Sequence, residues 1–279
     1  MNNKQYLVKL QETMTLKGNS SKSIYIYTQT VKQFFRFHKK PAHEITTQDV
    51  KDYLLHLVNR GLDPSTINSK HSMLLIFFQG AMEKPEIMFP IPYLKRKKKL
   101  PTILTKEEVW RIIEHATTLK YKTIFMVVYS SGLRLNEVAN LRISDIDSKR
   151  MQIFVHQGKG GKDRYTILSR KALESLRKYY RTYRPDDWLF YPKSNKNKHL
   201  STRAIQDNFV LSRGTAGIAK KCTMHSLRHA FASHLLENET DLFSIMRLLG
   251  HCSLRTTQVY LHLSPTQIHK VISPLDLEV

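Results

Sequence analysis

A basic run flanked by prolines divides this 279-residue chain near the end of its first third. The flanking prolines are Pro90, Pro92 and Pro101, and the run is Lys95, Arg96, Lys97, Lys98 and Lys99. Proline disfavours regular structure, and consecutive like charges repel one another. The pattern predicts an extended linker over 95–101 between one domain at 1–94 and a second at 102–279. A solvated surface patch is the alternative, but the basic character of both flanks favours a linker that lies on phosphates.

The positive charge extends over the whole chain. Its formal net charge is +22, from 45 basic and 23 acidic residues. Residues 1–100 hold 17 Lys and Arg against 7 Asp and Glu, and residues 101–279 hold 28 against 16. An excess on both sides of the linker indicates a long contact with a polyanion, and nucleic acid is the first candidate. A generally basic protein without such a partner is the alternative.

Cysteine usage and apolar runs bear on where the protein acts. Only Cys222 and Cys252 are present, which excludes a disulfide framework and fits a reducing compartment. The N-terminus lacks the apolar core of a signal peptide, and no apolar run is long enough to span a membrane. We therefore expect a soluble cytoplasmic protein with no membrane partner.

The first domain is expected to be a small bundle of about four helices. Apolar residues over 21–40 follow helical spacing, among them Ile24, Val31 and Phe34. A helix beginning after Thr46 ends near Gly61, and Asp63-Pro64 opens another over 64–84. The aromatic residues in these stripes are interpreted as core rather than as platforms for bases.

The second domain is expected to be mostly helical with one small antiparallel sheet, so the fold class is mainly α. Thr105 and Glu108 form a capping box that begins a helix. Alternating residues on both sides of a glycine-rich centre at 158–161 predict a β-hairpin over 151–168. Helices are predicted over 170–185 and 201–214, and four more over 225–238, 241–251, 254–263 and 264–272.

Two arginines stand out as ligands for a phosphodiester. A guanidinium fork pairs with two phosphate oxygens and stays charged, so Arg134 and Arg228 could clamp the non-bridging oxygens. Glu137 lies three residues after Arg134 on a predicted helix and could hold its guanidinium in place, although a routine surface ion pair is the alternative. His225 and Arg228 share one helical turn. A metal site at His225, His229 and Cys222 is disfavoured, because a zinc-protease pair would need Glu where Ser226 stands.

The hairpin supplies a further candidate. Lys159 lies among glycines that allow close approach to DNA, and could donate a proton to a leaving oxygen. Lys162 and Arg164 could hold phosphates nearby, and an ordinary cationic hairpin is the alternative. Tyr260 is the candidate nucleophile, and His251, nine residues earlier, could bond a non-bridging oxygen during its attack. No acidic metal cluster accompanies these residues, and no cofactor is expected because Arg, Lys and His could do the work of metal ions.

Taken together, the segments GLRLNE, GKGGKDR, HSLRHAFASHLL and LLGHCSLRTTQVY resemble the tyrosine recombinase (phage integrase) family, and most of all its small Xer-type members. The resemblance covers about 105–265 strongly and the first 100 residues only by helical pattern and by the segment STINSKHSMLLIFF. It implies a core-binding domain and a catalytic domain that close as a clamp around duplex DNA. A larger integrase would carry an extra N-terminal domain, for which this sequence leaves no room before residue 20.

The resemblance also implies the roles of the residues. Arg134, Arg228, His225 and His251 would bind the scissile phosphate, with His225 assisting proton transfer. Lys159 would be the general acid, and Tyr260 would form a 3′-phosphotyrosyl link without metal or ATP.

The assembly implied by the family is a tetramer, homomeric or mixed with a related recombinase, on duplex DNA with paired inverted sites. It would exchange strands through a Holliday junction. In the tail, Leu261, Ile268, Val271 and Ile272 would dock onto a neighbouring protomer, with a self-packed helix as the alternative.

Two other functions compete with site-specific recombination. A type IB topoisomerase-like enzyme would use the same chemistry without partner protomers, and relaxation of a plasmid lacking a recombination site would distinguish it. A non-enzymatic DNA-binding protein would read the major groove with its helices. That interpretation has to treat six matched residues as accident.

The charge distribution gives a first prediction. Affinity for DNA should fall steeply as salt rises, because contacts to many phosphates release counterions. Replacing the basic residues of 95–99 with alanine should weaken binding with little change in sequence preference. Filter binding or anisotropy over a salt series measures both effects. Equal affinity at low and high salt would contradict the interpretation.

Overall fold

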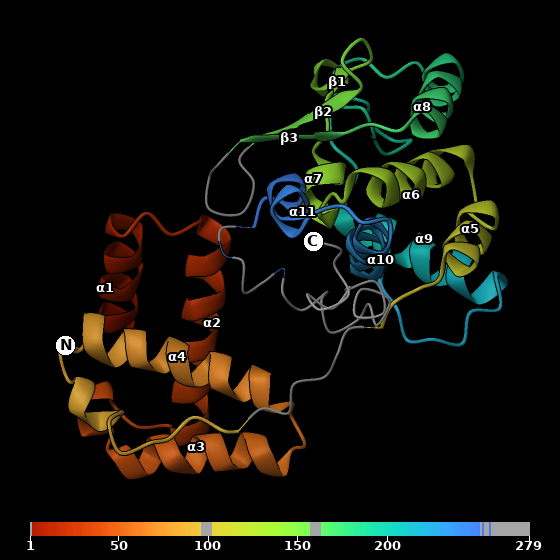
Figure 1. Cartoon of the computed structure of the whole chain (residues 1–279). Helices are drawn as coiled ribbons and strands as arrows, with labels where there is room; N and C mark the ends of the chain where they lie inside the picture. Colours follow the sequence, from red (N-terminus) through yellow and green to blue (C-terminus); the bar gives the residue numbers. More distant parts are fainter. Residues whose placement is uncertain (1, 96–101, 157–162, 252, 254–256, 258–279) are drawn as a thin grey trace, which may run out of the picture. The chain divides into compact units, whose positions relative to one another are not determined.

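The computed structural model describes residues 2–95, 102–156, 163–251, 253 and 257. The chain divides into two compact units, Met1–Lys98 and Lys99–Val279. The predicted fold class is confirmed, because the described residues are mainly helical and carry one small antiparallel sheet (Figure 1). In this described part, no helix combines the length and the apolar character needed to cross a membrane.

The N-terminal unit is a helical bundle. It consists of α1 (Asn3–Leu16), α2 (Ser21–His38), α3 (Thr47–Asn59) and α4 (Pro64–Gly80), with 3-10 turns η1 (Ala42–Glu44) and η2 (Pro85–Ile87). The predicted starts of two helices are confirmed. Thr46 and Asp49 form a capping box at the start of α3, and Asp63 caps α4 with Pro64 in its first turn.

Aromatic side chains fill the core of this unit. Phe34 is fully buried, with its ring centroid 5.3 Å from that of Tyr53 and 6.1 Å from that of Phe78, both edge-on. Edge-to-face pairs add to the free energy gained by burying the rings. The expectation that these aromatics form core is confirmed.

A segment without regular secondary structure, residues 91–95, follows the bundle and is hydrogen-bonded to α4. The Asn68 side chain donates to the Leu94 carbonyl and accepts from the Leu94 N–H, both at 2.9 Å. His71 is buried, and its Nε2 donates to the Ile91 carbonyl at 3.0 Å. Burial lowers the pKa of His71, so the ring is neutral and can leave its second nitrogen without a proton. These bonds fix the chain up to Lys95, the first residue of the basic run. The other four, 96–99, lie outside the described residues.

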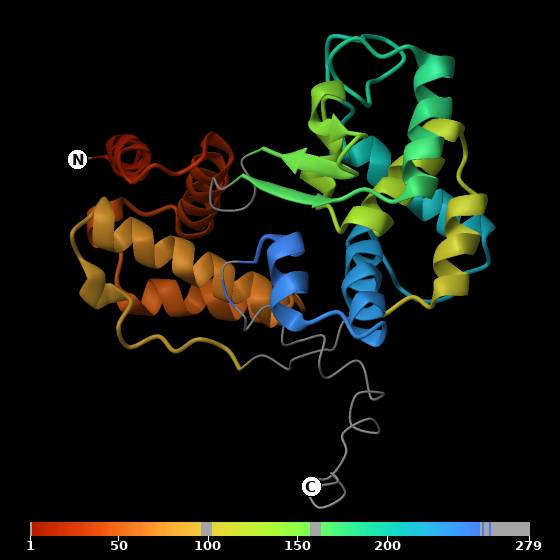
Figure 2. The same cartoon turned by 45° about the horizontal axis from the view of Figure 1, so that its top comes forward.

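The C-terminal unit contains the sheet and the other helices. Its elements are α5 (Lys106–Glu114), α6 (Leu119–Ser131), α7 (Leu135–Ala139), η3 (Ile143–Asp145), β1 (Ile146–Asp147), β2 (Gln152–Val155), β3 (Arg164–Ile167), α8 (Arg170–Tyr183), α9 (Thr202–Thr215), α10 (Met224–Glu237) and α11 (Leu242–Leu249). Within this unit α10 contacts α5, α6 and α11, while β3 contacts α6 and α11 (Figures 1 and 2). Helix α10 is buried on most of its surface, so it lacks a simple amphipathic stripe.

The predicted hairpin is present, with β2 and β3 antiparallel and Val155 opposite Arg164. Its tip, 157–162, lies outside the described residues. The additional strand β1 was not predicted, because two residues are too short to show an alternating pattern. The Thr105–Glu108 capping box is confirmed at α5. The two helices predicted after 253 lie outside the described residues, apart from Thr257, which is helical.

The aromatic core of the N-terminal unit gives a stability prediction. Replacing Phe34 with alanine should lower the free energy of unfolding by about 3–5 kcal/mol, since it leaves a cavity among rings that cannot fully collapse. Phe89, which is 73% exposed, is the matched control and should change it by less than about 0.5 kcal/mol. Urea unfolding followed by far-ultraviolet circular dichroism measures both, and equal effects would contradict this account of the core.

Candidate active site

Four separate segments of the C-terminal unit meet around one carboxylate. They are the start of α7, the start of β3, the buried face of α10 and the turn after α11 (Figure 1). Hydrogen bonds link Glu137 to Arg134 and Arg164, and Arg228 to His251. The two groups form one network because all three arginines also donate to backbone carbonyls of residues 248–250, and Arg228 lies 3.9 Å from Glu137. Residues more than a hundred positions apart in the sequence therefore share one site.

Arg134 is fixed at the N-cap of α7. Its backbone N–H donates to Glu137 Oε2 and its Nη1 to Glu137 Oε1, both at 2.7 Å. Its Nη2 donates to the Gly250 carbonyl at 3.2 Å. The side chain is 20% exposed, which makes it the more accessible of the two arginines predicted as phosphate ligands. The i, i+3 spacing read from the sequence accounts for the ion pair.

Arg228 is almost fully enclosed, with its side chain 1% exposed. Its Nη1 donates to the Gly132 carbonyl, and its Nη2 donates to the Leu249 carbonyl at 2.6 Å and faces His251 Nε2 at 3.1 Å. A buried guanidinium needs such partners, because desolvation of an unsatisfied charge is very costly. The carbonyls at the ends of α6 and α11 also carry the negative end of each helix dipole, which favours a cation there.

Glycine is required at both helix ends. Gly132 and Gly250 have φ of +64° and +62°, in the left-handed region. A Cβ atom at Gly132 would lie 2.5 Å from the ring of Phe231, and one at Gly250 would lie 2.7 Å from Cδ of Arg164. The backbone can therefore turn beside the arginines only without a side chain at these positions.

The histidines of the site are electrically neutral near pH 7. Because Arg228 can only donate, His251 Nε2 accepts, and the proton on Nδ1 is donated to Thr257 Oγ1 at 2.9 Å. Burial and the charges of Arg228 and Arg134 lower the pKa of His251 to about 4. His225 is exposed, but desolvation by its surroundings and then the charges of Arg228 and Arg134 lower its pKa as well. A neutral imidazole at position 225 is able to accept a proton.

Glu137 is the only carboxylate of this network. Burial alone would raise its pKa, but hydrogen bonds and charge from Arg164, then from Arg134, lower it to about 2. Arg228 Nη1 lies 3.9 Å from Glu137 Oε2. Three guanidinium groups thus face one carboxylate, and with neutral histidines the network keeps a net positive charge. Such a site favours an anion, as a phosphodiester is.

Several predicted residues lie outside the described residues. These are Lys159, Lys162 and Tyr260, the basic residues Arg96, Lys97, Lys98 and Lys99, and the tail residues Leu261, Ile268, Val271 and Ile272. Lys95 is described, in the N-terminal unit. In the C-terminal unit, His225 lies one helical turn before Arg228, and its ring centroid is 4.6 Å from that of His229.

Three kinds of contact in the site were not predicted from the sequence. They are the bond of His251 to Thr257, the bonds of Arg228 to carbonyl groups at the ends of α6 and α11, and the bond of Arg164 to Glu137. The alternation of β3 gave no signal for the position of Arg164. It would place the apolar Tyr165 and Ile167 toward the core, but both are exposed whereas Thr166 is buried.

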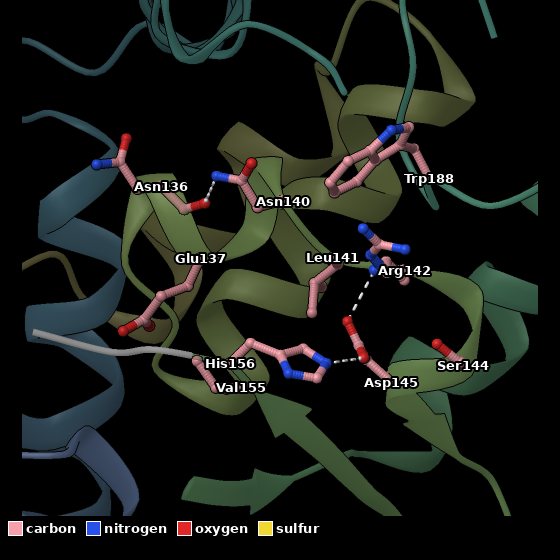
Figure 3. A pocket seen from close by; sticks show the side chains of 10 residues that line it. All are labelled: Asn136, Glu137, Asn140, Leu141, Arg142, Ser144, Asp145, Val155, His156 and Trp188. Carbon is pink, nitrogen blue, oxygen red and sulfur yellow. Dashed lines mark hydrogen bonds and ion pairs between the residues drawn. The ribbon is translucent and has the colours of Figure 1, made fainter. Parts of the chain in front are cut away.

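A cavity of about 600 Å³ lies beside α7 (Figure 3). Across it, the Arg142 guanidinium stacks 4.6 Å from the ring of Trp188, and Asp145 bonds His156 at 2.8 Å. Glu137 is the one member of the arginine network that lines it. Within the described ranges, no cluster of three or more His, Cys, Asp or Glu side chains is placed to hold a metal ion.

Comparison with known families gives matches over both units. The phage integrase family profile matches residues 102–267, and the profile of the phage integrase N-terminal SAM-like domain matches residues 6–86. A putative integrase/recombinase of Sinorhizobium fredii, y4qK, is 36% identical over 96% of this chain and 88% of its own length. Tyrosine recombinase XerA of Pyrococcus horikoshii is 30% identical over 99% of this chain and 95% of its own length.

Solved structures extend the comparison. The crystal structure of XerA recombinase matches over 99% of both chains with a TM-score of 0.57 at 30% identity. A lambda integrase dimer bound to a core site matches 92% of this chain and 97% of its own chain, with a TM-score of 0.75 at 20% identity. The second match concerns the fold alone.

The low pKa of Glu137 gives a pH prediction. A carboxylate whose folded-state pKa is depressed contributes stability that is complete above its ordinary pKa of 4.5 and is lost as pH falls through about 2. Glu137→Gln should therefore lower the free energy of unfolding by roughly 2–3 kcal/mol at pH 7. The difference from the unaltered protein should shrink below pH 4.5. Denaturant unfolding at several pH values measures it, and a difference independent of pH would contradict the charge assignment.

Proposed function

Because the chain belongs to the phage integrase family, as a tyrosine recombinase that cuts and rejoins DNA at specific sites, we propose that Arg134 and Arg228 hold the scissile phosphate while Tyr260 attacks it. In this proposal the domain at 1–94 and the domain at 102–279 bind DNA on either side of the basic linker 95–101. The two matched profiles lie on either side of that linker.

One observation carries the assignment of the site. Arg134, Arg228 and His251, from three distant segments, meet at the turn after α11, where both arginines donate to its carbonyls and the cluster keeps a net positive charge. His251 in turn is bonded to Thr257, and Tyr260 follows Thr257 by three residues.

The proposed reaction exchanges one phosphate ester bond for another. The Tyr260 oxygen forms a bond to phosphorus as the bond from phosphorus to the 5′-oxygen breaks. The tyrosine proton passes to neutral His225, and Lys159 protonates the leaving 5′-oxygen. The arginines stabilise the charge that develops on the non-bridging oxygens. Attack by a 5′-hydroxyl on the resulting 3′-phosphotyrosyl link reverses the step, so joining needs no ATP.

The phosphate would also change the state of His251. In the network His251 accepts from Arg228, and its pKa is held at about 4 by burial and by the surrounding arginines. An anion among these groups offsets their charge and favours protonation of the ring. His251 could then donate to a non-bridging oxygen, which is the role assigned to it.

Related proteins support an assembly on DNA. Solved structures include a lambda integrase tetramer bound to a Holliday junction and XerH bound to its difH substrate. We propose that four copies of this chain, or a mixture with a related recombinase, act on paired inverted sites in duplex DNA. We expect this activity in the cytoplasm, where a free thiol such as that of buried Cys222 stays reduced.

Covalent trapping tests the proposal. In a duplex nicked near the cleavage point, cleavage releases a short fragment that carries the 5′-hydroxyl, and this fragment diffuses away. Rejoining is then prevented, so the protein stays attached to the 3′ phosphate and is seen as a denaturation-resistant adduct. Tyr260→Phe should abolish the adduct and keep DNA affinity within about twofold, because one hydroxyl contributes little to a large charged interface. Tyr180→Phe, at a surface position of α8, is the matched control and should form adduct normally. Adduct formation by Tyr260→Phe would refute the assignment.

A further inference from the structure

Arg164 was expected to hold a DNA phosphate, but its donors bond protein groups instead. We infer that Arg164 is a positioning residue, which joins β3 to Glu137 and to the turn after α11 and so fixes Arg134 and His251 for the reaction. This inference rests on the proposed function of the same site.

The bonds of Arg164 to Glu137 and to the turn after α11 together form a tether. The first part of this tether is a bidentate ion pair with Glu137. Arg164 Nη1 donates to Glu137 Oε1 and Nη2 to Glu137 Oε2, each at 2.8 Å. The side chains of Arg164 and Glu137 are 9% and 7% exposed. A bidentate pair of this kind sets the orientation of both partners as well as their distance. Because Glu137 also binds Arg134 through its Oε1, the orientation of Arg134 follows from that of Arg164.

The second bond holds the turn that carries His251. Arg164 Nε donates to the Leu248 carbonyl at 3.0 Å. The side chain also packs so tightly against Gly250 that a Cβ atom there would lie 2.7 Å from Arg164 Cδ. Arg134 also donates to the Gly250 carbonyl. The turn is thus held by two arginines, and His251 follows it directly.

The place of Arg164 in the hairpin gives the tether its functional meaning. It is the first residue of β3, paired with Val155, the last residue of β2. Lys159, the proposed general acid, lies between these two strands in the sequence. The tether therefore connects the hairpin that bears the general acid to the residues that bind the phosphate.

A role as phosphate ligand fits the contacts less well. A phosphate oxygen would have to displace the Glu137 carboxylate from both Nη groups of Arg164 or the Leu248 carbonyl from its Nε. At Arg228 it would replace the neutral carbonyls of Gly132 and Leu249. Displacing Glu137 would leave a buried carboxylate with fewer partners, which is strongly unfavourable. Arg134, at 20% exposed, offers a donor group at lower cost.

The charge of Glu137 offers a second readout, beside the cleavage rate at saturating DNA. The charged and titratable groups that face Glu137 are Arg134 at the start of α7, Arg164 on β3, and Arg228 and His225 on α10. Arg164 is the strongest of the influences that lower the Glu137 pKa. Without it the carboxyl should protonate at a higher pH, so the stability that Glu137 contributes should be lost at a higher pH than in the unaltered protein.

The experiment uses the full chain with Arg164→Met and Arg164→Lys. Single-turnover cleavage of the nicked duplex is measured at saturating DNA, DNA affinity is measured over a salt series, and unfolding is followed as the pH is lowered from 7 toward 2. Both variants should cleave about 100-fold more slowly, because misplacing catalytic groups by about 1 Å has that effect. Lysine should not restore the rate, since one ammonium cannot bridge both Glu137 oxygens and the Leu248 carbonyl. DNA affinity and its salt dependence should stay within error of the unaltered protein.

Acid unfolding of Arg164→Met should begin at a higher pH than that of the unaltered protein. Arg150→Met removes one charge from a side chain that is 78% exposed, and it is the matched control for net charge. If Arg164→Met does not fold, Arg164→Lys carries the test, because it keeps the buried charge.

Two outcomes separate this inference from the proposed function. If the unaltered protein forms adduct, and Arg164→Lys cleaves normally while Arg164→Met loses affinity and about one unit of salt slope, Arg164 is a phosphate ligand and the inference is overturned. If the unaltered protein forms no adduct, the proposed function fails.

Discussion

The architecture of the site depends on one buried carboxylate. Glu137 bonds Arg134 and Arg164 and lies 3.9 Å from Arg228, so α7, β3 and α10 are joined through a single side chain. Three guanidinium groups would repel one another without it, and each would be costly to bury alone. The same arrangement keeps an excess of positive charge where a phosphodiester is proposed to bind. Glu137 therefore neutralises part of the charge of the three arginines, and the positive charge that remains attracts the phosphate.

Helix ends supply the rest of the support. The Arg228 guanidinium bonds carbonyls at the ends of α6 and α11, where unpaired acceptors and the helix dipole both favour a cation. Gly132 and Gly250 allow the chain to leave each helix in the left-handed conformation while a neighbouring side chain packs against the backbone. Two ordinary helix terminations thereby become parts of a charged site.

Local interactions made much of this predictable. Thr46 and Thr105 begin helices as their capping patterns indicate, and the ion pair of Arg134 with Glu137 follows from a separation of three residues at a helix start. Strand β1 was not predictable because two residues carry no periodicity. The partner of Arg164 lies 27 residues away, and no local pattern specifies which carboxylate a strand residue will meet.

The sequence by itself determined most of the helices, the β2–β3 hairpin and the residue types that are proposed to bind and cleave a phosphodiester, because capping, periodicity and side-chain chemistry are local properties. Only the tertiary structure decided that Arg134 is more exposed to an anion while Arg164 is engaged with Glu137. It also decided that His225 and His251 are neutral. Burial and ion pairing determine the exposure of the arginines and the pKa values of the histidines. Each depends on groups brought together from distant parts of the chain, as Arg228 and His251 are with Glu137.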